Sequence, residues 1–209
     1  MKPLRIALTK GRLEKDTVAL FDRIGLDTDA VKNKGRRLIL PVGNDIEVVL
    51  AKAADVITYV EHGVCDLGVV GKDTIAESGG RFYEVLDLGF GKCRFAVAAP
   101  KGTDIFGSYH EITVASKYPN VARRFFERRG MDVRIIKIEG SVELAPLIGL
   151  ADCIVDIVET GATLKENGLE VITDVMPISA RVIVNMAAMK LRQDDIHALV
   201  SRMEDMLSL

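Results

Sequence analysis

The sequence has no long apolar run and few residues of the types that mark disulfide-rich or zinc-binding proteins. No apolar stretch approaches the roughly 18 residues that a transmembrane helix needs, so a membrane-spanning protein is not expected. The opening residues MKPLRIALTKGR hold only a short apolar run between charges, which is too short for the core of a signal peptide. These absences predict a cytoplasmic protein.

Cysteine is scarce, and its spacing excludes the usual cysteine chemistry. Cys65, Cys93 and Cys153 are odd in number, far apart and form no CxxC pair. With only three histidines in the chain, no zinc-ligand spacing is found either. We therefore expect the cysteines to be small buried apolar residues.

The three histidines, His62, His110 and His197, have no nucleophile or acid at a meaningful spacing. Ser-His-Asp and Cys-His catalysis therefore have no support in the sequence. The common nucleotide motifs GxGxxG and GxxxxGK[ST] are absent, and the nearest match, Gly68–Asp73, has the wrong spacing for a phosphate-binding loop. That segment is either a strand followed by the start of a helix or a ligand contact.

Charge is nearly balanced, with 28 Lys and Arg against 30 Asp and Glu and a net charge of −2. A protein that coats nucleic acid is normally basic, so no nucleic-acid partner is predicted. A local cationic pocket for a small phosphorylated ligand remains compatible with this balance.

What the sequence does contain is an alternation of strand-like and helix-like segments over 209 residues, with 48% apolar residues. The expected strands are 4–8, 66–71, 83–88, 93–100, 112–116, 133–138 and 152–158, and segments 36–42 and 46–52 are expected to form a hairpin. Amphipathic segments lie between many of them, and the last helix follows Asp194 and Asp195. The pattern predicts an α/β protein with mixed, mostly parallel sheet and flanking helices.

Two crossovers divide this pattern into two lobes. One is predicted near residue 90 and a second near Val171–Pro177. Lobe I would then comprise residues 1–90 and 176–209, and lobe II residues 91–175. Because ligands favour interdomain clefts, we expect the site between the lobes.

The stretch DIVETGATLKENGL, residues 156–169, carries the clearest chemical signal in lobe II. Asp156 and Glu159 end an apolar run, and carboxylates at that place can accept hydrogen bonds from the vicinal hydroxyls of a ribose. The turn Thr160–Thr163 offers hydroxyls, a glycine and the N–H groups of a helix start, which suit a phosphate. The alternative is a plain helix capped by Thr160.

A second candidate is TKGRL, residues 9–13, at the end of the first strand. Lys10 and Arg12 can bind phosphate oxygens there, whereas the alternative is a solvated basic turn. Arg36 and Arg37 precede a strand whose alternation would point them to opposite faces, so at most one should reach the site. Taken alone, this pair favours a purely structural role.

A third candidate is EGSVELAP, residues 139–146, where Ser141 follows an expected strand. Capping of a helix by Ser141, with Glu143 near its start, is the simpler interpretation of this turn.

Four ordered motifs resemble the ATP phosphoribosyltransferase family: TKGRL, TYVEHGVCDLGVVGKD, ELAPLIGLAD and DIVETGATLKENGL. The resemblance covers essentially the whole chain. It implies two lobes like those of type II periplasmic binding proteins. It also implies a glycosyltransferase that joins ATP to 5-phosphoribosyl 1-diphosphate (PRPP), with Mg²⁺ and release of pyrophosphate, in the first step of histidine biosynthesis.

The resemblance also implies roles for individual residues. It assigns PRPP binding to Asp156, Glu159, Thr160, Gly161, Ala162 and Thr163, and catalytic contacts to phosphate and diphosphate to Lys10, Arg12 and Arg36. It places Gly71, Asp73 and Ser141 near the nucleotide.

The chain is similar to the short form of the family, because no regulatory domain follows its last helix. That form implies a regulatory subunit related to histidyl-tRNA synthetase and a homodimer of this chain. Two rival functions are a solute-binding protein and a phosphoribosyltransferase for a free nucleobase. A solute-binding protein is disfavoured because this sequence shows no signal peptide. Nucleobase phosphoribosyltransferases usually have two adjacent acids before the turn, whereas Asp156 and Glu159 are three residues apart.

Overall fold

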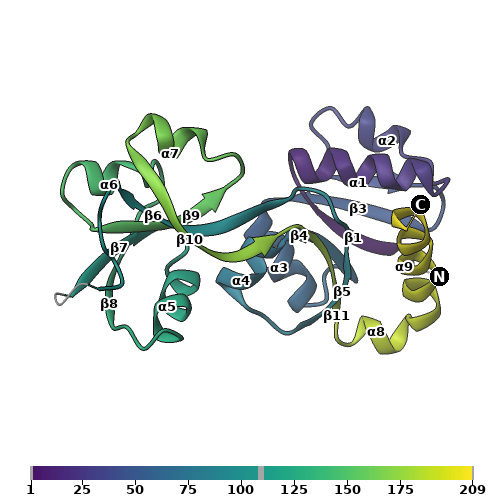
Figure 1. Ribbon diagram of the computed structural model, residues 1–209. Helices are drawn as coiled ribbons and strands as arrows, with labels where there is room; N and C mark the ends of the chain where they lie inside the picture. The colour runs from purple at the N-terminus through teal and green to yellow at the C-terminus, as the bar shows by residue number, and fades with distance from the viewer. Residues whose placement is uncertain (1, 108–110, 209) are drawn as a thin grey trace. The chain divides into compact units, whose positions relative to one another are not determined.

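The computed structural model describes residues 2–107 and 111–208 (Figure 1). The chain forms two compact units. Unit 1 comprises Met1–Gly91 and Ser179–Leu209, and unit 2 comprises Lys92–Ile178. The chain thus changes unit after Gly91 and again after Ile178.

Unit 1 is built on a six-stranded sheet in the order β2-β3-β1-β4-β11-β5. Its strands are β1 (Leu4–Thr9), β2 (Ile39–Val42), β3 (Ile46–Ala51), β4 (Leu67–Gly71), β5 (Phe82–Asp87) and β11 (Ala180–Asn185). Strand β1 runs parallel to both β3 and β4, β2 and β3 form the expected hairpin, and β11 is antiparallel to β4 and β5. The carboxyl ends of β1, β3 and β4 therefore meet at one edge of the sheet.

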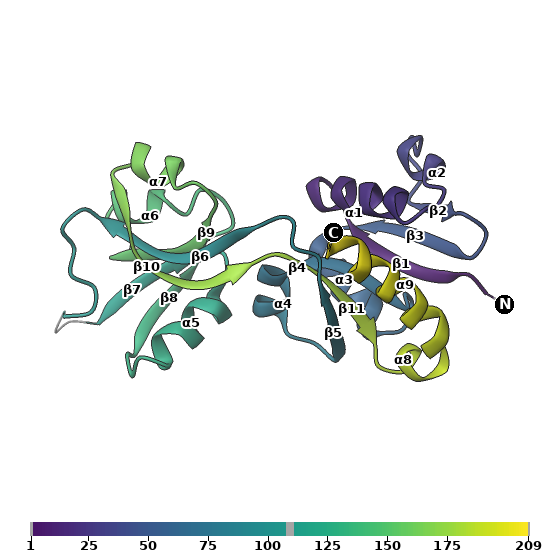
Figure 2. The same cartoon turned by 45° about the vertical axis from the view of Figure 1, so that its right-hand side comes forward.

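Helices cover both faces of this sheet (Figures 1 and 2). They are α1 (Arg12–Arg23), α2 (Asp29–Lys32), α3 (Ala53–Glu61), α4 (Lys72–Ser78), α8 (Ala188–Leu191) and α9 (Gln193–Leu207). Ile6 of β1 lies in the core cluster that contains residues of α1 and α9, whereas Ala7 lies in the cluster that contains Val56 and Val60 of α3. Successive residues of a strand point to opposite faces, so β1 serves both cores. Within the described part of the chain, no helix is long and apolar enough to cross a membrane.

Unit 2 is built on a five-stranded sheet in the order β10-β6-β9-β7-β8. Its elements are β6 (Cys93–Pro100), β7 (Ile112–Ser116), α5 (Pro119–Glu127), β8 (Val133–Lys137), α6 (Leu144–Leu147), β9 (Cys153–Val158), α7 (Ala162–Glu166) and β10 (Leu169–Ile178). Ala145 of α6 and Leu164 of α7 share a core cluster with Ile154 and Val158 of β9. Figures 1 and 2 show α5 on the opposite face. The turn after β9 is therefore backed by a packed layer.

Two features of the sheets differ from the sequence-based expectation. Among the described residues, parallel pairing is limited to β1 with β3 and β4 and to β7 with β8 and β9, and the other five pairings are antiparallel. Residues 171–177, expected as a crossover, instead lie within β10, which pairs antiparallel with β6. The residue pattern of this segment alone does not show the pairing, because the partner strand lies about 80 residues away in the sequence.

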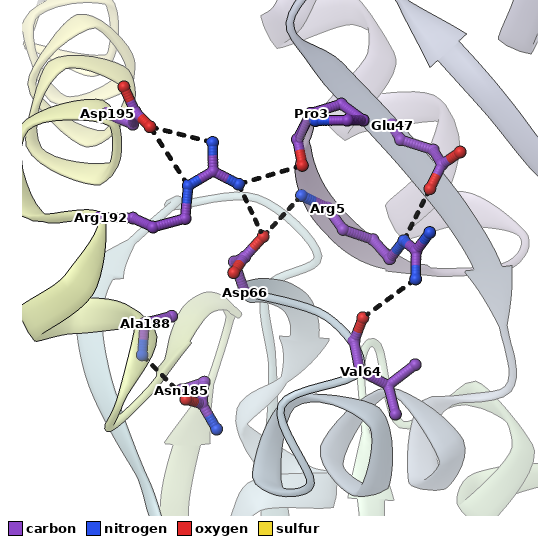
Figure 3. Close-up of polar contacts among 9 residues, drawn as sticks. All are labelled: Pro3, Arg5, Glu47, Val64, Asp66, Asn185, Ala188, Arg192 and Asp195. Carbon is purple, nitrogen blue, oxygen red and sulfur yellow. Dashed lines mark hydrogen bonds and ion pairs between the residues drawn. The ribbon is translucent and has the colours of Figure 1, made fainter. Parts of the chain in front are cut away.

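A charged network ties both ends of the chain to unit 1 (Figure 3). The Arg192 guanidinium donates to the Pro3 carbonyl at 3.0 Å, to Asp66 at 3.3 Å and to Asp195 at 2.9 Å. The same Asp66 carboxylate accepts the Arg5 backbone N–H at 2.8 Å. The start of β1, the start of β4 and the first turn of α9 are thereby held together.

Asn185, at the end of β11, makes a second and more deeply buried set of contacts. Its Nδ2 donates to the carbonyls of Val60 at 2.7 Å and Glu61 at 3.3 Å, and its Oδ1 accepts the N–H groups of Ala187 and Ala188, each at 2.9 Å. The side chain is thus fully used in joining the end of α3 to the turn that leads into α8 (Figure 3 shows the Ala188 contact).

We predict that Asn185→Ala lowers the free energy of unfolding by about 2 kcal/mol, because buried donors and acceptors lose their partners. Urea denaturation of the purified variant measures this loss. Asn44→Ala, at an exposed turn position, is the matched control and should stay within about 0.5 kcal/mol of the wild type. Equal stability of the two variants would contradict the assignment.

Candidate functional site

The turn after β9 lines a pocket of about 320 Å³ in unit 2. All six residues that the sequence assigns to PRPP are in its wall: Asp156, Glu159, Thr160, Gly161, Ala162 and Thr163. Glu143, which precedes α6, joins them. The pocket therefore combines three carboxylates with a turn rich in hydroxyl and backbone N–H groups.

Backbone geometry leaves several donors of this turn unused. Gly161 has φ 79°, a left-handed conformation that glycine adopts without strain, and it is the N-cap of α7. Thr160 Oγ1 accepts the Ala162 N–H at 3.3 Å, so Thr160 supports the helix start without being its N-cap. Within the described residues, the Thr163 hydroxyl and the N–H groups of Gly161 and Thr163 donate to no other group. These donors are available to an anion.

Asp156 is a partly desolvated carboxylate in the wall of the unit 2 pocket. Burial raises its pKa, the Ile157 N–H at 2.8 Å opposes that shift, Glu143 adds to it, and Lys117 opposes it. The protein thus keeps a partly desolvated carboxylate at the wall of the pocket. Such a group costs stability unless a ligand supplies hydrogen bonds to it.

Unit 1 carries a second pocket, of about 460 Å³, with a very different wall. It is lined by Lys10, Gly11, Glu14, Lys15, Lys34, Gly35, Arg36, Arg37, Leu38 and Leu50. Five cationic side chains thus surround one carboxylate, and they come from the turn after β1, the first residues of α1 and the turn before β2. The arrangement suits a multiply charged anion.

The positions of Arg36 and Arg37 correct the expectation of opposite faces. Strand β2 begins at Ile39, and both arginines lie in a preceding turn in which the Arg37 N–H donates to the Lys34 carbonyl, so strand alternation does not apply to them. Both line the pocket. The Arg37 guanidinium donates to the carbonyls of Asn33 at 3.1 Å and Lys34 at 3.3 Å, whereas that of Arg36 contacts no polar group of the described residues. Arg36 is therefore the more available of the two.

The turn that carries Lys10 is held by the parallel strands on either side. Thr9 Oγ1 donates to the Val69 carbonyl at 2.9 Å, and the Lys10 N–H donates to the Ala51 carbonyl at 2.9 Å. Gly11 follows with φ 104°, a conformation that other residues rarely adopt. Arg12 is the exposed first residue of α1 and does not line the pocket.

The three residues predicted to lie near a nucleotide line neither of these two pockets. Gly71, at the end of β4, lies against Asp73, because a Cβ on Gly71 would come within 2.0 Å of Asp73 Oδ1 and the Asp73 side chain would have to move. Ser141 was expected to cap a helix, but α6 begins at Leu144 with Glu143 as its N-cap. Ser141 instead offers its backbone carbonyl to the Leu144 N–H at 3.2 Å.

Cysteine and histidine stay outside both pockets, as far as the described residues go. Cys65 and Cys153 are buried, and desolvation raises their pKa values to about 11 and about 12. Cys93 is only half-buried, because it begins β6 at the margin of unit 2, so the expectation of three buried cysteines holds for two. His110 lies outside the described residues.

Four charged pocket residues, Glu14, Lys15, Lys34 and Glu143, escaped the sequence-based prediction, and so did Lys117, which lines neither pocket but whose charge acts on Asp156. Glu143 was interpreted only as part of a helix start, and Lys34 lies 20 residues from its partner Glu14. Lys117 directly follows β7, a position from which strand-end reasoning would have found it.

Comparison with known proteins assigns the family. The family model for ATP phosphoribosyltransferase (HisG) matches residues 52–205. The chain belongs to the ATP phosphoribosyltransferase family. An ATP phosphoribosyltransferase from Clostridium kluyveri is 56% identical over 204 residues, covering 97% of this chain and 93% of the relative. The family predicted from the four motifs is confirmed.

Solved structures support both the family and the fold. The ATP phosphoribosyl transferase (HisG:HisZ) complex from Thermotoga maritima gives a TM-score of 0.83 at 33% identity, over 98% of each chain. The periplasmic aliphatic sulphonate binding protein SsuA from Escherichia coli gives 0.61 at 13% identity, over 100% of this chain and 74% of its own. The expected likeness of this chain to periplasmic binding proteins is thus confirmed at the level of the fold.

We predict that Asp156→Asn stabilises the ligand-free protein at neutral pH. A raised pKa means that Asp156 favours the folded state only while protonated, and this contribution is lost as the pH rises through its folded pKa. Asparagine stays neutral and can still accept the Ile157 N–H. Urea denaturation from about pH 3 to pH 8 should show the variant gaining on the wild type as the pH rises.

The exposed Asp132, in the same unit, supplies the control. Asp132→Asn should show no such pH-dependent gain. An Asp156→Asn variant that is less stable than the wild type at neutral pH would contradict the desolvation argument.

Proposed function

We propose that this chain transfers the phosphoribosyl group of PRPP to N1 of the adenine of ATP, with release of pyrophosphate, as the first step of histidine biosynthesis. Membership of the ATP phosphoribosyltransferase family supports the reaction. The observation that carries the proposal is the unit 2 pocket, where carboxylates stand beside unused hydroxyl and N–H donors on one turn.

The unit 2 pocket is proposed to bind the ribose 5-phosphate part of PRPP. Asp156 and Glu159 would accept hydrogen bonds from the ribose hydroxyls, and the turn Thr160–Thr163 would donate to the 5-phosphate. Charge-assisted hydrogen bonds of this kind are stronger than those between neutral groups. The ribose hydroxyls would also supply the hydrogen bonds that the desolvated Asp156 carboxylate lacks.

The unit 1 pocket is proposed to bind the diphosphate of PRPP through Lys10 and Arg36, with Arg12 as a further contact from the start of α1. Cations that stabilise the charge developing on a leaving group commonly contribute about 10²- to 10³-fold in turnover. Gly71, Asp73 and Ser141 are proposed to lie near the nucleotide.

In the proposed reaction, the bond from adenine N1 to C1 of the ribose forms as the C1–O bond to the diphosphate breaks. The electron pair of that bond leaves with pyrophosphate, so positive charge develops at C1 and negative charge on the leaving group. Adenine N1 has a lone pair and needs no strong base to attack. Catalysis would therefore rest on positioning and on electrostatic stabilisation.

Mg²⁺ is part of the same proposal. The described residues contain no group of three or more His, Cys, Asp or Glu arranged as metal ligands. Magnesium commonly uses one or two carboxylates together with substrate phosphates and water. We therefore propose that it enters with the PRPP diphosphate, whose charge it neutralises.

The protein partners are also proposed. The similar Thermotoga maritima structure is a HisG:HisZ complex, which supports a regulatory subunit of that type for this chain. A homodimer of this chain and a cytoplasmic location complete the proposal.

The reaction is tested by product mass. The purified chain with Mg²⁺ and PRPP should convert ATP, but not free adenine, into a phosphoribosyl adduct with one pyrophosphate per adduct. An adduct with adenine alone would favour a nucleobase phosphoribosyltransferase. If no acceptor reacts, even with a HisZ-type subunit added, the reaction is wrong and a binding protein is the better assignment.

We predict that Thr163→Val weakens PRPP binding by about tenfold, because one charge-assisted hydrogen bond to the 5-phosphate is lost. Isothermal calorimetry with PRPP measures the change. Thr113→Val, on β7 of the same unit and outside the pocket, should bind PRPP like the wild type. Unchanged affinity in Thr163→Val would remove Thr163 from the phosphate site.

A further inference from the structure

Glu14 is a buried carboxylate in the wall of the cationic pocket of unit 1. The residue is only 7% exposed, and it lines the pocket together with three lysines and two arginines. By charge alone, a carboxylate there repels the anion that the cations attract. Its presence needs a reason that outweighs this repulsion.

The contacts of Glu14 supply that reason. Its Oε2 accepts the Gly11 N–H at 3.4 Å, and its Oε1 forms an ion pair with Lys34 Nζ. Gly11 has no side chain with which to cap α1, so Glu14 closes the start of this helix from within. One carboxylate thus joins the turn that carries Lys10 to the turn that carries Lys34 and Arg36.

Not every acid near the start of α1 is placed in this way. Asp16 lies only two residues further along the same helix, beyond its first turn, and it does not line the pocket. Glu14 alone of the two reaches both turns. The ion pair is also shielded, because the Glu14 side chain is 9% exposed and that of Lys34 is 35% exposed. Shielding from water makes such a pair stronger than a surface pair.

We propose that Glu14 is a positioning residue for diphosphate binding, and that it acts by holding the two cationic turns at one fixed spacing. The proposal rests on the proposed function in taking a diphosphate as the ligand of this pocket. Glu14 itself does not touch the ligand. Repulsion between Glu14 and the anion weakens binding. This loss is offset because the cations are already in place and need no reorganisation when the anion binds.

The direction of the effect separates this role from a purely electrostatic one. Removing a negative charge from an anion pocket should tighten anion binding if charge were all that mattered. Loss of positioning should weaken it. Glu14→Gln keeps an oxygen for the Gly11 N–H but loses the charge that pairs with Lys34, and Glu14→Ala loses both.

The test is calorimetry on the full chain with two probes, inorganic pyrophosphate and ribose 5-phosphate. Glu14→Ala should bind pyrophosphate about tenfold more weakly than the wild type, and Glu14→Gln should fall between the two. Ribose 5-phosphate, bound by unit 2, should keep its wild-type affinity in both variants. Asp16→Asn removes the same charge from the same helix and should leave both affinities unchanged.

Several outcomes would overturn the proposal. They are tighter or unchanged pyrophosphate binding by the Glu14 variants, an equal loss of affinity for both probes, and a wild type that binds no pyrophosphate. The product assay is independent of this order of affinities. If the wild type binds pyrophosphate and the variants follow the expected order of affinities while no adduct forms, the result would support the positioning role of Glu14 and contradict the proposed reaction.

Discussion

The hydrogen bonds on either side of the end of β1 are the interaction on which the unit 1 site depends. Thr9 Oγ1 reaches the Val69 carbonyl in β4, and the Lys10 N–H reaches the Ala51 carbonyl in β3. Parallel strands end at the same edge, so these bonds fix where the chain must leave the sheet. Gly11 then turns the backbone, and Lys10 is held beside the segment before β2. The cationic pocket follows from this sheet edge.

In the proposed function, the two pockets hold phosphate by opposite means. In unit 1 the wall is rich in lysine and arginine, which attract an anion from a distance but need a fixed spacing to hold it. In unit 2 no cation among the described residues lines the pocket, and the turn offers hydroxyl and backbone N–H groups beside carboxylates. Hydrogen bonds of this kind act only at short range, so the pocket discriminates between ligands by their geometry. A phosphorylated ligand without hydroxyl groups would form no hydrogen bonds with Asp156 and Glu159. The first pocket supplies attraction and the second supplies discrimination.

Local patterns in the sequence predicted the strand ends and the turns that line the two pockets. The pairing of segments that lie far apart in the sequence could not be predicted in this way. Strand ends followed by TKGR and ETGAT could be placed because apolar runs, glycines and hydroxyls are close neighbours in the chain. Arg36 and Arg37 were misplaced because strand alternation was extended into a turn. The β10 pairing and the Glu14–Lys34 pair depend on contacts between distant segments, which periodicity does not encode. The α6 start was misjudged by two residues, within the usual uncertainty of helix ends.

The place of β11 in the first sheet has a consequence for how the chain is made. Residues 180–185 lie between β4 and β5, so the sheet of unit 1 lacks an inner strand until nearly the whole chain has left the ribosome. Unit 2 is one continuous segment and is free to fold earlier. During that interval β4 and β5 have unpaired edges, the condition in which nascent proteins recruit chaperones or mispair with other chains. Synthesis thus ends with the step that closes the sheet, and a chain released early would have its unit 2 turn but no complete unit 1.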